Sequence, residues 1–128
     1  MIRTLVVDDE ALARERIISL LKKENDIEVV GECSDGEEAL NKINNLKPDL
    51  VFLDIQMPMM SGVDVIKNLT DYLPEVIFVT AYDEYAVEAF EMNAIDYLLK
   101  PFDQERFFKT LARARQRILG NNTTEISE

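Results

Sequence analysis

Residues 50–54 read Leu-Val-Phe-Leu-Asp, four apolar residues followed by an aspartate. A run that is apolar at every position, rather than at every second one, is typical of a strand buried on both faces of a parallel sheet. Lys47-Pro48-Asp49 stops the preceding helical pattern, and Met57-Pro58 interrupts the chain soon after the run. The stretch therefore predicts a central strand of an α/β protein, with Asp54 at its carboxyl end.

An alternation of apolar strands and amphipathic helices extends from this segment in both directions. Apolar segments predict further strands at 2–8, 27–33, 75–80 and 94–99. Helical spacing predicts helices at 11–23, 36–46, 84–92 and 103–119, and one between Val63 and Leu73 that ends at Pro74. Such repeats require a parallel sheet with helices on both faces. We therefore predict a doubly wound, five-stranded α/β fold of the flavodoxin-like type, with strand order 2-1-3-4-5.

The last predicted helix and the residues after it mark the end of the domain. Asp103 stands where a helix N-cap is expected. Residues 120–128 read Gly-Asn-Asn-Thr-Thr-Glu-Ile-Ser-Glu, which is polar and lacks periodicity. We expect one domain over residues 1–119 and a flexible tail, or the start of a linker, over 120–128.

The composition limits the functions open to this chain. Its 128 residues, 47% hydrophobic and 30% charged, suit one globular domain. The absence of histidine removes His-dependent catalytic triads and His metal sites, and the single Cys33 cannot form an internal disulfide. The apolar runs are far shorter than the roughly 20 residues that span a bilayer, and the N-terminus lacks a signal-type cleavage site. We therefore expect a cytoplasmic location.

Charge is distributed unevenly along the chain. The formal net charge of −11 predicts that the domain as a whole repels nucleic acid and anionic membranes. Residues 104–118 are the exception, with a net charge of +4. We interpret this helix as a solvated face whose cations favour the helix C-terminus, and not as a DNA-binding helix.

Polar residues stand at the ends of four predicted strands, namely Asp8-Asp9, Asp54, Thr80 and Lys100-Pro101. Ligands of open parallel sheets bind outside the carboxyl ends of the strands, near the point where the strand order reverses. In the predicted order the first and third strands flank this point, so the three aspartates converge. Because their charges repel one another, we expect a hard divalent cation among them. Mg²⁺ fits oxygen ligands best, with Mn²⁺ as an alternative.

The same residues predict phosphoryl transfer. Lys100 offers a mobile positive charge for a phosphoryl oxygen, and Thr80 offers a hydroxyl donor. Together with a carboxylate and a metal they describe transfer onto an aspartate, which gives an acyl phosphate. Asp54 is the predicted acceptor because it ends the most buried strand. Taken singly, Asp9 could be a helix cap, Lys100 a surface lysine and Thr80 a plain strand end, but their joint placement favours a site.

Four short motifs occur together along the chain: Asp8-Asp9, Asp54 within Asp54–Pro58, Thr80-Ala81 and Lys100-Pro101-Phe102. In this combination, residues 1–119 resemble the receiver domain of bacterial two-component response regulators. The resemblance implies that Asp54 accepts a phosphoryl group from a sensor histidine kinase. It implies that Asp8, Asp9, Asp54 and the backbone carbonyl of Gln56 bind Mg²⁺, and that Lys100 contacts the phosphoryl group.

The resemblance also implies a conformational switch. Thr80 would move toward the phosphoryl group and Tyr97 would turn inward, which changes the face formed by the fourth helix, fifth strand and fifth helix. Ala81 is small and would leave the phosphoryl site open. Pro101 would follow a cis peptide bond. Apart from the resemblance, the acidic fourth helix (residues 83–92) and the basic fifth helix offer opposite charges for a two-fold contact, so we expect phosphorylation to favour a homodimer through this face modestly.

A narrower resemblance covers residues 80–102, from Thr80-Ala81-Tyr82-Asp83-Glu84-Tyr85 to Lys100-Pro101-Phe102. This stretch resembles receivers of the LytR/AlgR type, whose output domain is a LytTR-type DNA-binding domain. The resemblance implies transcriptional control through a domain outside this chain. We expect that this domain alone binds neither DNA nor a membrane.

Other functions stay open as alternatives. A Mg²⁺-dependent aspartyl-phosphate phosphatase would need a second aspartate two residues after the nucleophile on the first strand, whereas Asp8 is followed by Asp9-Glu10-Ala11. A flavin binder would need a Ser/Thr/Gly-rich phosphate-binding loop after the first strand, whereas this loop reads Asp8-Asp9-Glu10 and would repel a phosphate. A receiver-like interaction module that takes no phosphate is the third alternative. We expect no enzymatic activity beyond self-phosphorylation from small donors and autodephosphorylation. Gln56 and Tyr82 are expected to tune the access of the water that hydrolyses the acyl phosphate.

Overall fold

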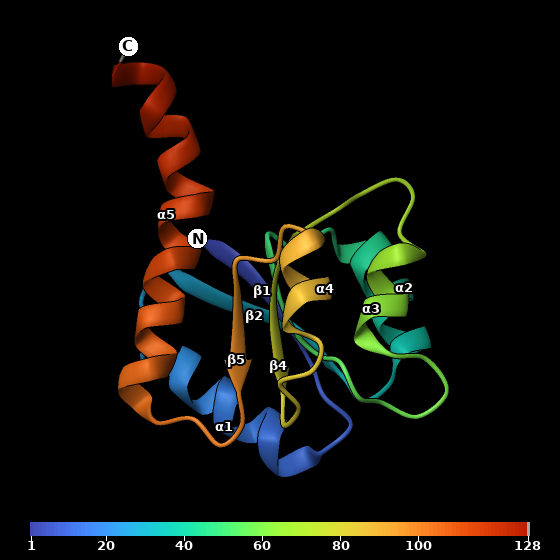
Figure 1. Ribbon diagram of the computed structural model, residues 1–128. Helices are drawn as coiled ribbons and strands as arrows, with labels where there is room; N and C mark the ends of the chain where they lie inside the picture. Colours follow the sequence, from blue (N-terminus) through green and yellow to red (C-terminus); the bar gives the residue numbers. More distant parts are fainter. Residues whose placement is uncertain (128) are drawn as a thin grey trace.

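The computed structural model describes the backbone of residues 1–127 and the side chains of residues 1–120, which form one parallel sheet with helices on both sides (Figure 1). The strands are β1 (Ile2–Val7), β2 (Ile27–Cys33), β3 (Leu50–Asp54), β4 (Glu75–Thr80) and β5 (Asp96–Leu99). The helices are α1 (Ala11–Leu21), α2 (Gly36–Leu46), α3 (Gly62–Lys67), α4 (Ala86–Glu91) and α5 (Gln104–Ser127). The sheet order is β2-β1-β3-β4-β5, which confirms the predicted fold class and strand order.

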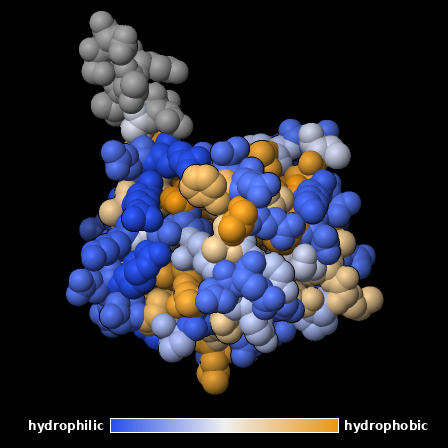
Figure 2. Space-filling model, viewed as in Figure 1, coloured by the Kyte–Doolittle hydropathy of each residue, from blue (hydrophilic) through white to orange (hydrophobic). Residues whose placement is uncertain are grey.

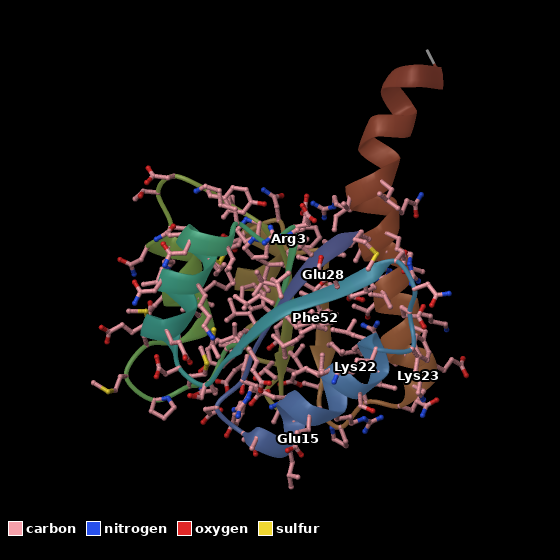
Figure 3. The ribbon with its side chains drawn as sticks, turned by 180° about the vertical axis from the view of Figure 1, so that it is seen from behind. Arg3, Glu15, Lys22, Lys23, Glu28 and Phe52 are labelled. Atoms are coloured by element: carbon pink, nitrogen blue, oxygen red, sulfur yellow. The ribbon has the colours of Figure 1, made fainter. Side chains whose placement is uncertain are left out.

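The buried strand β3 contributes to a separate hydrophobic core on each face of the sheet. Val51 and Leu53 pack with residues of α2, α3 and α4, whereas Leu50 and Phe52 pack with residues of α1 and α5. The Phe52 ring stacks on that of Phe107 from α5, with their centroids 5.5 Å apart, and Figure 3 shows Phe52 in the interior. Alternate residues of one apolar run therefore hold both helical layers.

Helix α3 is shorter than the sequence predicts. It begins with a capping box, in which Ser61 accepts from the Asp64 amide and the Asp64 carboxylate accepts from the Ser61 amide. It ends at Lys67, and at the C-cap residue Asn68 both the backbone N–H and the side-chain amide donate to the backbone carbonyl of Asp64. Leu69 and Leu73, which suggested a longer helix, follow its end.

Helix α5 begins as predicted and extends further than predicted. The Asp103 carboxylate accepts from the Arg106 amide at 2.8 Å, which confirms the N-cap. The helix extends to Ser127 instead of ending at Leu119, so it includes most of the segment expected to be a flexible tail. The predicted division between 1–119 and 120–128 stays a prediction, since the side chains of residues 121–128 lie outside the described part.

The basic face of α5 is less solvated than expected, because its arginines form ion pairs with the body of the domain. Arg106 and Arg113 both contact Asp96 at the start of β5. Arg115 contacts Glu24 and Asp26, and Arg117 contacts Glu75. Hydrogen bonds from Arg106 and Thr110 outweigh the effect of burial and hold the pKa of Asp96 below its usual value. These pairs attach α5 to three other parts of the fold.

Candidate functional site

The carboxyl ends of β1, β3, β4 and β5 meet at one edge of the sheet (Figure 1). Asp8 follows β1, Asp54 ends β3, Thr80 ends β4 and Lys100 follows β5. The Lys100 ammonium lies 2.8 Å from Asp8 Oδ2 and 3.4 Å from Asp54 Oδ2. Residues up to 92 positions apart in the sequence therefore meet at this edge, as the strand order predicts.

An acidic cluster surrounds this lysine. Carboxylate oxygens of Asp8, Asp9, Glu10 and Asp54 all lie within 4.8 Å of one another. Asp9 is not the helix cap that it could have been, because Glu10 holds the N-cap position of α1 and makes no side-chain capping bond there. The sequence reasoning missed Glu10, although its position directly after the two aspartates was a usable signal.

The donor set suits a hard divalent cation. Asp8 Oδ1 accepts from the backbone N–H of Glu10 at 2.9 Å. Asp8 Oδ2 is buried, and among the described residues it accepts no hydrogen bond of good geometry, although the Lys100 ammonium faces it. A buried carboxylate oxygen of this kind, beside further carboxylates, fits the all-oxygen coordination that Mg²⁺ prefers. The residues present therefore fit the predicted metal.

The surroundings of Asp54 disfavour its negative charge. Burial and then the nearby negative charge of Asp8 raise the pKa of Asp54 to about 7, against the opposing effect of Lys100. Its Oδ1 accepts a hydrogen bond from the backbone N–H of Gln56 at 3.1 Å, which fixes the carboxylate at the end of β3. Burial would lower the pKa of Lys100, but the close carboxylates of Asp8 and Asp54 raise it above its usual value.

A hollow of about 330 Å³ opens above these groups. Its lining residues are Asp9, Glu10, Asp54, Gln56, Ala81, Tyr82 and Lys100. Ala81 and Tyr82 are exposed, and the small Ala81 side chain leaves this part of the wall open. Thr80 is fully buried, and its Oγ1 accepts from the Tyr82 amide at 3.4 Å. The site thus combines a buried carboxylate, that of Asp54, with space for a small anion.

Tyr85 and Tyr97 each contact a residue that lines the hollow, and the sequence reasoning missed both contacts. The hydroxyl of half-buried Tyr97 donates to the backbone carbonyl of Tyr82. The Gln56 side chain donates to the Tyr85 hydroxyl. Both contacts attach the segment between β4 and α4 to the site. The Lys100–Pro101 peptide bond is cis, as the resemblance implies.

Comparison with known proteins places this geometry in a family. The family model of the response regulator receiver domain matches residues 4–112. The chain is 52% identical to the transcriptional regulatory protein BtsR of Escherichia coli K12, over 91% of this chain and 49% of that protein. It therefore spans about half the length of the curated relatives it matches.

Solved structures agree with this assignment. The response regulatory domain of mrkE from Klebsiella pneumoniae is 34% identical, with a TM-score of 0.84, covering 92% of this chain and 98% of that one. The CheX–CheY–BeF₃–Mg²⁺ complex of Borrelia burgdorferi contains a chain 28% identical, with a TM-score of 0.76, covering 89% of this chain and 87% of that one. Within the described residues, no helix combines the length and apolar character needed to cross a membrane. The chain belongs to the response regulator receiver domain family.

Proposed function

We propose that Asp54 of this receiver domain accepts a phosphoryl group from a sensor histidine kinase. The observation that carries the proposal is the meeting of Asp54, Asp8 and the Lys100 ammonium beneath a hollow open to a small anion. A buried carboxylate beside a fixed cation is suited to form an acyl phosphate and to hold it.

The step is a direct displacement. An oxygen of the Asp54 carboxylate bonds to phosphorus while the bond from phosphorus to the kinase histidine nitrogen breaks, and that nitrogen keeps the electron pair. Lys100 supplies positive charge to a phosphoryl oxygen. Asp8, Asp9, Asp54 and the Gln56 backbone carbonyl would hold Mg²⁺, or Mn²⁺ in its place. Bound by these residues, the metal would neutralise the negative charge that gathers on the transferring group.

The signal is the new charge at the end of β3. A phosphoryl group adds about −1.5 to −2 of charge and three acceptor oxygens. The Thr80 hydroxyl is buried one strand away and would turn from the Tyr82 amide toward these oxygens. Tyr97 is bound to the carbonyl of the same Tyr82, so a movement of this segment would release its ring to move inward.

The output is transcriptional control in the cytoplasm, through a LytTR-type DNA-binding domain outside this chain. The naming of BtsR as a transcriptional regulatory protein supports this, and so does the extra length of the relatives.

Exposed Val87 and Phe90 on α4 and Leu99 on β5 offer apolar surface for a homodimer through the face formed by α4, β5 and α5. In Figure 2 this side of the molecule shows hydrophobic patches among polar ones. The opposite charges of α4 and α5 contribute less to the expected dimer contact, because all four arginines of α5 already form ion pairs within the domain.

Mass spectrometry of the intact protein tests the phosphoacceptor. After incubation with Mg²⁺ and acetyl phosphate, the protein should carry one phosphoryl group that alkaline treatment removes. Asp54→Asn should take up none, because an amide is a poor nucleophile. Asp71→Asn removes an exposed carboxylate elsewhere and should be labelled like the unmodified chain. Full labelling of Asp54→Asn would contradict the proposal.

A further inference from the structure

Within the described residues, three carboxylates surround the Lys100 ammonium. Lys100 Nζ lies 2.8 Å from Asp8 Oδ2, 3.0 Å from Glu10 Oε1 and 3.4 Å from Asp54 Oδ2. An ammonium group has three N–H donors. A phosphoryl oxygen that binds Lys100 therefore competes with these carboxylates for its ammonium group, and two of them, Glu10 and Asp54, already accept hydrogen bonds from it.

The three carboxylates differ in how firmly they are held. The side chains of Asp8 and Asp54 are 1% and 5% exposed, and each has its second oxygen bound to a backbone N–H. The Glu10 side chain is 67% exposed and makes no capping bond to α1. Glu10 is thus the carboxylate that can leave Lys100 without breaking other hydrogen bonds.

Glu10 also lines the hollow through which a phosphoryl donor enters. Its charge adds to those of Asp8, Asp9 and Asp54, so it repels an incoming anion as well as engaging the cation that would attract one. Both effects act in the same direction, against uptake of phosphate.

We propose that Glu10 is a positioning residue that holds Lys100 in the unphosphorylated protein and is displaced from it by the phosphoryl group. Glu10 therefore restrains phosphorylation, while Lys100 stays oriented between Asp8 and Asp54. The inference rests on the proposed role of Asp54 as the phosphoacceptor.

The test compares Glu10→Gln with Glu15→Gln, which removes the same charge from an exposed position on α1 (Figure 3). At saturating Mg²⁺, Glu10→Gln should take up phosphate from acetyl phosphate roughly two- to fivefold faster, the factor that corresponds to one exposed ion pair. It should also reach half of its beryllofluoride-induced rise in Tm at a lower beryllofluoride concentration. Glu15→Gln should match the unmodified chain in both measurements.

The outcomes separate this inference from the proposed function. Unchanged uptake and unchanged beryllofluoride titration in Glu10→Gln, with normal labelling of Asp54, would overturn the role of Glu10 alone. Slower uptake together with weaker Mg²⁺ binding would also overturn it, and would make Glu10 part of the metal site. Absence of labelling in the unmodified chain would overturn the proposed function and this inference with it.

Discussion

The backbone carbonyl of Asp54 lies so close to Gly62 that a Cβ atom on this glycine would stand 2.2 Å from the carbonyl oxygen. The Gly62 amide donates to the backbone carbonyl of Ile55 at 2.9 Å, so the start of α3 folds back onto the end of β3. The absence of a side chain at Gly62 therefore allows the backbone at the end of β3 to lie this close to the start of α3.

We predict that Gly62→Ala destabilises the domain by about 1–3 kcal/mol, the usual cost of forcing an extra carbon into a packed site. Phosphoryl uptake should also slow, because relief of the clash displaces Asp54. Urea unfolding and acetyl phosphate labelling measure the two effects. Gly120→Ala is the control, since its Cβ would meet only Gln116 Cγ, at 3.6 Å. Equal stability of the two variants would contradict the prediction.

A second prediction concerns pH and Asp54 in the absence of Mg²⁺. Burial and Asp8 raise the pKa of Asp54 from 3.8 to about 7, so the folded state binds this proton more tightly than the unfolded state does. The stability of the domain should therefore fall, through this group, as the pH rises from about 4 to 7. Asp54→Asn removes the charge and should be more stable than the unmodified chain at pH 8, by about 1–2 kcal/mol after screening.

Thermal unfolding in EDTA at several pH values checks this expectation. The difference between the two proteins should shrink as the pH falls and disappear at about pH 3 and below, where Asp54 is protonated in both states because its unfolded-state pKa is 3.8. Asp71→Asn removes an exposed carboxylate and should show no such dependence. A lower Tm for Asp54→Asn at pH 8 would show that the charge of Asp54 stabilises the fold.

The strand order and the edge that carries the site could be predicted, because both follow from local patterns. The apolar run 50–54 indicated a strand buried on both faces, and the polar residues at the strand ends then had to meet at one edge. The contact between Gly62 and Asp54 could not be predicted in this way. It depends on how the chain folds back after β3, and one glycine in the sequence does not specify that path.

Helix ends and long-range ion pairs were also beyond local reasoning. The spacing of Leu69 and Leu73 suggests a longer α3, but the helix ends at Lys67, with Asn68 as its C-cap. Arg115 pairs with Asp26 across 89 positions of sequence, so its partner was invisible in the charge pattern of the helix. A sequence pattern indicates whether a residue lies on the buried or the exposed face of its helix or strand. The ion pairs that it forms depend on which helices and strands pack together.

A third prediction separates uptake of phosphate from the response to it. Asp9→Ala should weaken Mg²⁺ binding, seen as a smaller rise in Tm on adding Mg²⁺, and should slow phosphorylation. Thr80→Ala should still be labelled, because the Thr80 hydroxyl binds the phosphoryl group after transfer and contributes little to the transfer itself. The beryllofluoride-induced change in the NMR amide signal of Tyr97 should be reduced in this variant.

Thr80→Ser keeps the hydroxyl and is the matched control, so it should restore the Tyr97 response. The assignment of roles would be wrong if Asp9→Ala and Thr80→Ala lost labelling equally. It would also be wrong if Thr80→Ala kept the full Tyr97 response.

The last prediction concerns assembly through the face formed by α4, β5 and α5. Val87 and Phe90 are 70% and 82% exposed on α4, and Leu99 is exposed on β5. We expect beryllofluoride with Mg²⁺ to favour a two-fold dimer through this apolar surface modestly, because the proposed switch residues Thr80 and Tyr97 lie on β4 and on β5, which belongs to this face. Light scattering at about 100 μM protein, with and without beryllofluoride, measures the change.

Phe90→Ser should weaken this dimer while leaving labelling of Asp54 intact, because its side chain lies on α4 and does not line the phosphoacceptor hollow. Met59→Ser is the control, since Met59 is a fully exposed apolar residue on the segment between β3 and α3, away from that face. A dimer lost in both variants would point to nonspecific association of apolar surface. A monomer that beryllofluoride leaves unchanged at this concentration would refute the dimer and leave the role of Asp54 intact.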